Sequence, residues 1–389
     1  MSDYLEAREV FIKCQSHFQQ IGDKMGAAQC LQSLGDIHRM LNEYSQATEA
    51  LKEAQSQFQQ IGHKMGAAQC LQSLGNIHSM LNEYSEATEA LREAQSQFQQ
   101  IGDKLGAAQC LKGLGNIHSM LDEYSEATEA LREAQSQFQQ IGDKLGAAQC
   151  LQSLGNIHSM LNEYSEATEA LKEAQSQFQQ IGDKRGAAQC LKSLGNIHRM
   201  LNEYSEATEV LQKAQSQFQQ IGDKMGAAQC LKSLGDIHYV LDEYSEATEP
   251  LREAQSQFQQ IGDKLGAAQC LQSLGDIHSA LNEYPEATEA LQEAQSQFQQ
   301  IGDKKGAAQC LISLGDIHTM LNEYSEATEA LKKAQSQFQQ MGVKLGAAQC
   351  LKSLGIIHSM LNEYSEATEA LREAQSQFQQ IGDKMGAAQ

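Results

Sequence analysis

Apolar residues recur along the chain in two alternating helical patterns. From Ala27 to Leu41 the apolar positions are separated by 3, 1, 3, 3 and 4 residues, which places them on one face of a helix. From Tyr44 to Ile61 the separations alternate between 3 and 4, again a helical spacing. A long coiled coil would continue this second spacing, but the pattern stops at Gly62 and restarts in another phase. We therefore expect an all-α chain, with a first helix (helix A) over about 24–41 and a second (helix B) over about 44–60.

This helix pair recurs every 40 residues. The sequence LGNIH or a near-copy of it follows that interval from Leu34 to Leu354, without insertion or deletion. A fixed period of this size is typical of solenoids, in which each repeat buries its apolar face only against its neighbours. We name a set of equivalent positions by its first residue, so that the Cys30 series is Cys30 and every fortieth residue after it.

The register of the repeat predicts three segments. Residues 1–23 match a helix B without its helix A, residues 24–383 hold nine A–B repeats, and residues 384–389 match the truncated start of a further helix A. Terminal repeats of a solenoid normally need a polar cap. We therefore expect either a fragment of a longer protein or ends that contact another molecule.

Turn residues support the predicted helix boundaries. The IGDK stretch supplies a glycine for a helix C-terminus and an aspartate for the next N-cap, and LNEYS supplies an asparagine that tolerates a left-handed turn. Both connections are short, so consecutive helices should pack antiparallel. Gly35 lies inside helix A, where glycine costs about 1 kcal/mol relative to alanine, and a close approach of helix B would offset that cost. Pro285 stands at a helix start, where proline is tolerated, whereas Pro250 is expected to kink its helix.

The cysteines and histidines do not form a recognisable chemical site. Nine of the ten cysteines belong to the Cys30 series, and equivalent atoms of stacked repeats should lie beyond the ~7 Å Cα separation of a disulfide. We expect small buried thiols. Each His38-series residue is ~12 Å along the helix from the nearest cysteine of its repeat, and no Cys-x-x-Cys or His-x-x-x-His pair occurs. Without a nucleophile motif or phosphate-binding loop, we predict neither an enzyme nor a metal or cofactor site, and we interpret the histidines as half-buried structural residues.

The net charge of the chain disfavours two classes of partner. The net charge is −21 and the acids are spread along the chain, which disfavours nucleic acid and anionic membrane. The sequence has no 18-residue apolar run, and no signal peptide is recognisable at MSDYLEAREV. A cytoplasmic protein that binds neither nucleic acid nor membrane is expected.

The repeated residues resemble a known family. The spacing of the tetratricopeptide repeat (TPR) is matched by Leu31, Leu34, Gly35, Asn42, Tyr44, Ala47, Leu51 and Ala54. His38 stands where that motif usually has tyrosine, and the period is 40 rather than 34 residues, so the chain resembles the longer variant of Pins-type adaptors and kinesin light chains. Its near-identical copies also resemble the repeat domains of fungal NOD-like receptors. The resemblance implies a right-handed α-solenoid of antiparallel helix pairs, with helix A lining a concave groove that binds peptides or proteins, and no catalysis.

Variation among the repeats concentrates on one face of helix A. The Met25, Gln32, Asp36 and Arg39 series are spaced 7, 4 and 3 residues apart and form one helical stripe, with the Met40 series beside it. Lysine and arginine there would suit carboxylates, asparagine would suit peptide amides and tyrosine would suit apolar groups. The candidate peptide-binding residues are Arg185, Gln189, Lys192, Asn196, Arg199, Lys232, Asp236 and Tyr239.

Other interpretations of the sequence stay open. Exposed positions tolerate change, so the stripe could also record neutral drift. The array could be a structural spacer or a rod that self-associates end to end through its open terminal helices, since head-to-tail contacts need not close. The carboxylate clamp of chaperone-binding TPR domains is not reproduced, because Gln189 and Ser193 stand where that clamp has asparagine.

Overall fold

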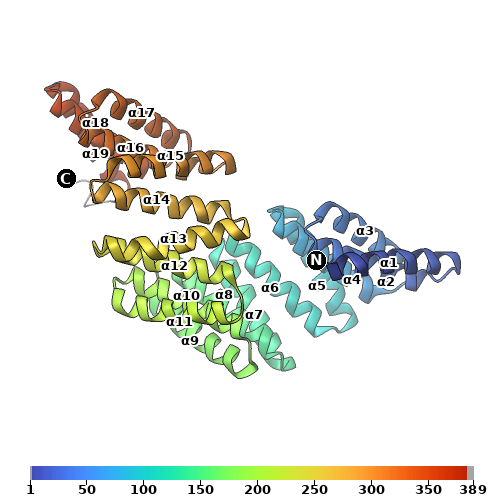
Figure 1. The fold of residues 1–389 in the computed structure, drawn as a ribbon. Coiled ribbons are helices and arrows are strands. Elements are labelled where there is room, and N and C mark those ends of the chain that lie inside the picture. Colours follow the sequence, from blue (N-terminus) through green and yellow to red (C-terminus); the bar gives the residue numbers. More distant parts are fainter. Residues whose placement is uncertain (1, 383–389) are drawn as a thin grey trace. The chain divides into compact units, whose positions relative to one another are not determined.

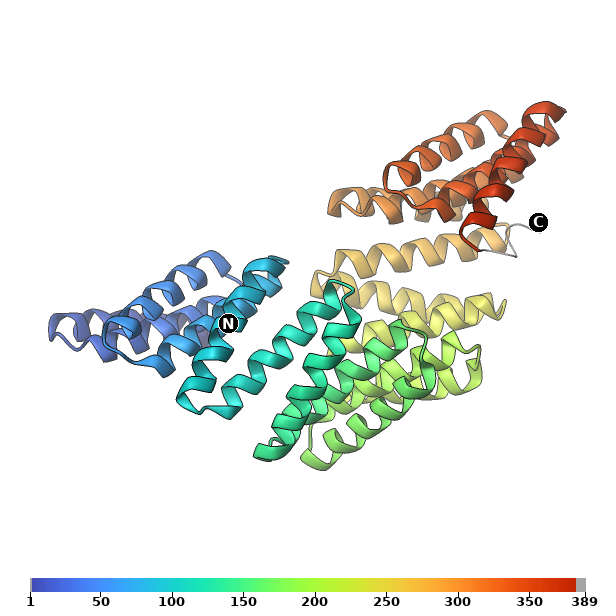
Figure 2. The ribbon, with the colours of Figure 1, turned by 180° about the vertical axis from the view of Figure 1, so that it is seen from behind.

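A computed structural model describes residues 2–382 of the chain, and every element within that range is an α-helix (Figure 1). Consecutive helices form antiparallel hairpins joined by short turns, as the second view also shows (Figure 2). The all-α solenoid expected from the sequence is therefore confirmed. The expected start of a further helix A at 384–389 lies outside the described residues.

The helix boundaries follow the repeat to within a residue of the sequence prediction. The chain opens on α1 (Ser2–Gln20), which has the register of a helix B. The helices A are α2 (Lys24–Met40), α4 (Lys64–Met80), α6 (Lys104–Met120), α8 (Lys144–Met160), α10 (Lys184–Met200), α12 (Lys224–Val240), α14 (Lys264–Ala280), α16 (Lys304–Met320) and α18 (Lys344–Met360). The helices B are α3 (Tyr44–Gln60), α5 (Tyr84–Ile101), α7 (Tyr124–Ile141), α9 (Tyr164–Ile181), α11 (Tyr204–Gln220), α13 (Tyr244–Ile261), α15 (Tyr284–Ile301), α17 (Tyr324–Gln340) and α19 (Tyr364–Gln380).

The array divides into two compact units. Unit 1 comprises residues 1–197 and unit 2 comprises residues 198–389, so the division falls inside α10. Within unit 1, α2, α4, α6 and α8 lie side by side in that order, and within unit 2 the same holds for α12, α14, α16 and α18.

The turn chemistry works as the sequence predicts. Asn42 and its equivalents, two of them aspartates, have a left-handed backbone with φ between 59° and 62°, and the N–H of Glu43 donates to the carbonyl of His38 at 2.8 Å, which closes helix A. At the other turn Asp143 Oδ1 accepts a bond from the N–H of Gly146 at 3.0 Å, an N-cap that satisfies a free helix donor. His63 replaces the aspartate once and caps with its ring, since Nδ1 accepts from Gly66 at 3.1 Å.

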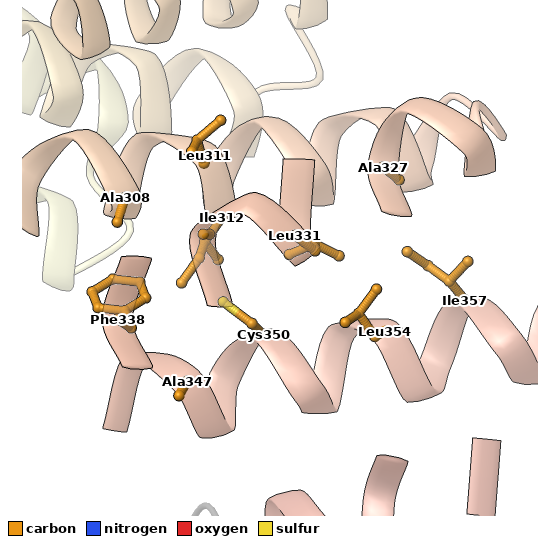
Figure 3. Close-up of a cluster of buried hydrophobic side chains, with 11 residues drawn as sticks. Ala308, Leu311, Ile312, Ala327, Leu331, Phe338, Ala347, Cys350, Leu354 and Ile357 are labelled. Atoms are coloured by element: carbon orange, nitrogen blue, oxygen red, sulfur yellow. The ribbon is translucent and has the colours of Figure 1, made fainter. Parts of the chain in front are cut away.

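Most core clusters of the described residues join three helices, and the last one joins only α18 and α19. The first such cluster contains two residues of α2, four of α3 and four of α4, namely Ala28 and Leu31, then Ala47, Leu51, Ala54 and Phe58, and finally Ala67, Cys70, Leu74 and Ile77. The equivalent cluster of α16, α17 and α18 is drawn in Figure 3. Each fully buried large side chain in such a cluster contributes about 1.5–3 kcal/mol. Two clusters share α4, and the same holds for α6, α14, α16 and α18, so these repeats bury their apolar faces against both neighbours.

Glycines permit the closest contacts. A Cβ on Gly155 would lie 2.7 Å from Leu171 Cγ and 3.2 Å from the carbonyl oxygen of Ala167, so helix B does approach helix A here, as expected for the Gly35 series. A second approach was not predicted. A Cβ on Gly106, at the start of α6, would lie 2.6 Å from the ring of Phe98. Glycine at both positions is thus required by packing and not by backbone conformation.

The Cys30 series is buried and unlinked, as expected, and all ten cysteines are free thiols. Burial raises the pKa of Cys70 to about 12, so the thiol stays protonated and unreactive near neutral pH. Pro250 does not end its helix, because α13 keeps the bounds of the equivalent helices in other repeats and still buries Leu251, Ala254 and Phe258. A kink at Pro250 remains a prediction.

Candidate functional site

The variable stripe of helix A forms a continuous surface in each unit. Because the helices A of a unit lie side by side, their equivalent positions form rows that cross from one repeat to the next. We call this the A surface and define it by the Met25, Gln29, Gln32, Asp36, Arg39 and Met40 series. It faces away from the Leu34 series, which is buried in the core.

A first polar row ties successive helices A together. Gln72 Nε2 donates to Gln109 Oε1 at 3.0 Å, and Lys112 Nζ donates to Gln149 Oε1 at 2.6 Å. The Lys112 ammonium also lies 5.9 Å from the centroid of the Phe138 ring, and burial lowers its pKa. At Gln72 and Lys112 the Gln32 series therefore bonds to the Gln29 series 37 residues further along the chain, on the next helix A.

A second row runs parallel to the first. In unit 1, Ser153 Oγ donates to Asn116 Oδ1 at 3.1 Å, and Ser193 Oγ donates to Asn156 Oδ1 at 3.0 Å. In unit 2 the acceptor is a carboxylate, since Ser353 Oγ donates to Asp316 Oδ1 at 3.1 Å. The sequence predicts the Asp36 series as contact positions alone, and this structural role was not predicted. The signal was the Gln29 series, which is glutamine throughout, and the Ser33 series, which changes only at Gly113.

Four of the predicted site residues lie in unit 1. Arg185, Gln189, Lys192 and Asn196 follow one another on a single face of α10 at steps of 4, 3 and 4 residues. Arg185 is exposed and the other three are partly buried. The prediction that they share a face of helix A fits this placement.

The other four predicted residues lie in unit 2. Lys232 Nζ forms an ion pair with Asp236 Oδ2 at 2.9 Å, one turn away on α12. Tyr239 is 37% exposed and its ring centroid lies 5.9 Å from that of Tyr244. Arg199 is partly buried, and its Nε has no hydrogen-bond partner in the described part of the chain. Within this unit the structure therefore brings Lys232 and Asp236 together and leaves the Tyr239 ring accessible.

Unit 2 also carries a row of acids, of which only Asp236 was predicted as a site residue. Asp236, Asp276 and Asp316 occupy equivalent positions on three adjacent helices. Burial raises the pKa of Asp276 to about 6 and the neighbouring Asp316 adds to the rise, while a hydrogen bond with Ser313 opposes it. Burial also raises the pKa of Asp316, with Lys352 and Ser353 acting in the opposite direction. Burial therefore disfavours the charged form of Asp276 and Asp316.

Apolar side chains are exposed on α16 and α18, at the C-terminal end of the A surface in unit 2. Ile356 on α18 is 39% exposed, and Met320 and Met360 are 64% and 52% exposed. Ile312 behaves differently. It replaces a glutamine or lysine of the other repeats but is buried, and Figure 3 shows it pointing toward Cys350 and Phe338 in the core. Ile312 is thus a packing residue and Ile356 is a surface residue.

The His38 series is structural, as predicted. The rings are half-buried, and His38 Nδ1 lies 2.5 Å from Glu43 Oε2 across the turn that joins helix A to helix B. That hydrogen bond is the main cause of a lowered pKa at Glu43. Among residues 2–382, no group of three His, Cys, Asp or Glu side chains could hold a metal ion. Within the same range, no helix is long and apolar enough to cross a membrane.

Cavities recur at the turns from helix B to helix A. The largest one described, of about 660 Å³, lies between Lys224 and Arg252 in unit 2. An equivalent cavity of about 320 Å³ lies between Lys104 and Gln137 in unit 1. Their recurrence at the same repeat position indicates a product of repeat packing, away from the A surface.

Comparison with protein families places the chain among helical repeats. The family described as Tetratricopeptide repeat matches residues 227–300 and 268–340. The family described as Soluble NSF attachment protein, SNAP, matches residues 2–140 and 107–261, and Anaphase-promoting complex subunit 5 matches residues 317–387. The two SNAP matches overlap at residues 107–140 and together span residues 2–261. A search of curated proteins found no match.

Solved structures share the fold at low sequence identity. The apo form of the quorum sensor NprR from B. thuringiensis has a TM-score of 0.66 at 13% identity, over 97% of this chain and 99% of that chain. A Rap protein complexed with competence and sporulation factor has a TM-score of 0.60 at 16% identity, over 88% and 97%. A signal transduction ATPase with a tetratricopeptide repeat sensor, from Pyrococcus horikoshii, has a TM-score of 0.65 at 14% identity. The match covers 88% of this chain but only 54% of that one.

Proposed function

Since the chain belongs to the tetratricopeptide-repeat family, we propose that it is a scaffold that binds proteins or extended peptides through the A surface, and that it is not an enzyme. We take residues 24–383 as the binding array. The observation that carries the proposal is the separation of a constant core from a variable surface. The Cys30 and Leu34 series are constant and buried in every repeat, whereas the Arg39 series changes among Arg, Ser, Tyr and Thr.

The similar structures support this proposal. One is named a quorum sensor, one was solved with competence and sporulation factor bound, and one carries a repeat sensor. Two polar rows prearrange amide, hydroxyl and ammonium groups on the A surface, which reduces the entropy lost when a peptide is bound. We propose the eight predicted residues as contacts within their respective units, namely Arg185, Gln189, Lys192 and Asn196 in unit 1 and Arg199, Lys232, Asp236 and Tyr239 in unit 2.

The test is selection of peptides from a random 12-residue display library on the immobilised 389-residue chain. Variants take residues from other repeats at the same position, so that the fold should be kept: Lys192→Gln, Arg199→Ser and Tyr239→Ser. The control exchanges exposed helix B residues in the same way, with Lys213→Glu and Arg252→Gln. We expect A-surface variants to weaken selected peptides about tenfold, or about 1.4 kcal/mol, and the control to leave them unchanged. A library without any enriched peptide, or loss of binding only in the control, would refute the proposal.

A further inference from the structure

One end of the A surface in unit 2 departs from the repeat. The Asp36 series is asparagine or aspartate in eight repeats and isoleucine only at Ile356. Ile356 and Met360 are one helical turn apart on α18, and Met320 stands at the position equivalent to Met360 on the adjacent α16. We call these three exposed side chains the α18 patch. Because other repeats are built with a polar residue at the Ile356 position, the isoleucine is not needed for packing.

The carboxylates beside the α18 patch have no lysine at the position that pairs with Asp236. Asp236 has Lys232 one turn earlier on its own helix, but Asp276 and Asp316 have Gln272 and Ile312 at that position. Lys352 acts on Asp316, whereas the charged group that acts most strongly on Asp276 is the carboxylate of Asp316 itself. A cation arriving from a partner would relieve this repulsion.

We propose that this region binds an extended segment of a partner protein in which a lysine or arginine lies three to five residues from an aliphatic residue. The inference rests on the proposed function and specifies its ligand. The cation pairs with the carboxylates of Asp276 and Asp316, and the aliphatic side chain covers the α18 patch. Exposed apolar patches flanked by charge are typical of interaction sites, and methionine adapts its shape to different partners.

The spacing follows from the geometry of the array. Packed helices lie about 8–10 Å apart, and an extended chain advances about 3.3 Å per residue. A segment crossing the helices A therefore advances about three residues per repeat. Ile356 lies one repeat after Asp316 and two after Asp276, so a cation placed between the two carboxylates is three to five residues from the apolar contact.

The test uses the same random 12-residue library on the 389-residue chain. The two diagnostic variants are Asp276→Asn and Ile356→Asn, which install the residue that Asn116 and Asn156 provide in unit 1. The control, Glu169→Gln with Glu173→Gln, removes two exposed acids from helix B in unit 1 and corrects for the loss of negative charge. Helicity and melting temperature of every variant establish that the fold is kept.

We expect the pool to be enriched in basic residues three to five positions from Leu, Ile, Val or Met. Each diagnostic variant should weaken these peptides at least about tenfold, the control less than about twofold, and rising salt should weaken them further, because exposed ion pairs are screened. Enriched peptides of different chemistry, or basic–aliphatic peptides that bind both diagnostic variants unchanged, would overturn this inference and leave the proposed function standing. A pool without enrichment would overturn both.

Discussion

Replacing Asp276 by asparagine should stabilise the repeats around it. The carboxylate is partly buried next to Asp316, and its pKa is raised from an ordinary 3.8 to about 6. At about 1.36 kcal/mol per pH unit, that difference corresponds to a cost of about 3 kcal/mol for keeping the side chain charged. Asparagine removes the charge and keeps the acceptor, as Asn116 does toward Ser153. Because the site is only partly buried, we expect a gain of about 1–3 kcal/mol at pH 7.5.

The pH dependence of this gain has a definite sign. A carboxyl group with a raised pKa holds its proton more tightly in the folded state, so it destabilises the fold increasingly as pH rises from about 4 to 6. The benefit of Asp276→Asn should therefore be complete above about pH 6 and fall to about 1 kcal/mol or less at pH 4.5.

Hydrogen exchange followed by mass spectrometry measures the effect locally, which suits an array that need not unfold in one step. Peptides from α14 and α16 can be told apart from the other repeats, because Ala280, Pro285, Ile312 and Thr319 are unique at their positions. Exchange in both helices should slow by about 5- to 150-fold at pH 7.5. Asp236→Asn, which breaks the ion pair with Lys232, is the control and should not slow exchange. Equal or faster exchange in Asp276→Asn at pH 7.5 would refute the electrostatic reasoning.

Three further substitutions test the packing, capping and proline arguments, each by thermal or urea unfolding. Gly155→Ala should destabilise by about 1–3 kcal/mol, because its Cβ would lie 2.7 Å from Leu171 Cγ. Asp143→Ala should cost about 0.5–2 kcal/mol, since it removes the acceptor of the 3.0 Å bond from Gly146. Pro250→Ala should stabilise by up to about 3 kcal/mol, because it restores a helical hydrogen-bond donor inside α13.

Each of these substitutions has a matched control in another repeat. Gly113→Ser installs the residue found at that position in the other repeats and should not destabilise the array, because glycine is the poorer residue inside a helix. His63→Asp exchanges one N-cap acceptor for another. It should change the free energy of unfolding by less than Asp143→Ala, which removes the acceptor altogether. Pro285→Ser lies at a helix start, where the missing N–H has no helical partner, and should be nearly neutral. A control that moves stability as far as its partner substitution would contradict the corresponding argument.

The helices, turns and core could be predicted because their determinants are local and are repeated nine times. The asparagine or aspartate of the Asn42 series predicts a left-handed backbone conformation. The spacing of Leu31, Leu34 and Ile37 predicts one buried helix face. Both signals need only the neighbouring residues of the same helix or turn. The 40-residue register then extends these predictions to the equivalent positions of every other repeat.

The chemistry of the A surface could be predicted only in part. The bond from Ser153 to Asn116 joins residues 37 positions apart, and helical periodicity shows which face a residue occupies but not which neighbour it reaches. The same limit explains Ile312, which lies in the variable stripe but turns into the core. The raised pKa of Asp276 depends on burial and on the carboxylate of Asp316 in the next repeat, and neither can be predicted from a single helix.

The sharing of helices such as α4 and α6 between two core clusters makes the repeats interchangeable. Since Leu51, Phe58, Cys70 and their equivalents are the same at successive junctions, excision of residues 84–123 would join Glu83 to Tyr124 and recreate the same contacts between α4 and α7. No closed core would be interrupted, so the length of the array can change by whole repeats without a new interface having to arise. Each such change would bring different A-surface residues side by side, so that recombination between repeats could alter what the array binds while leaving how it folds untouched.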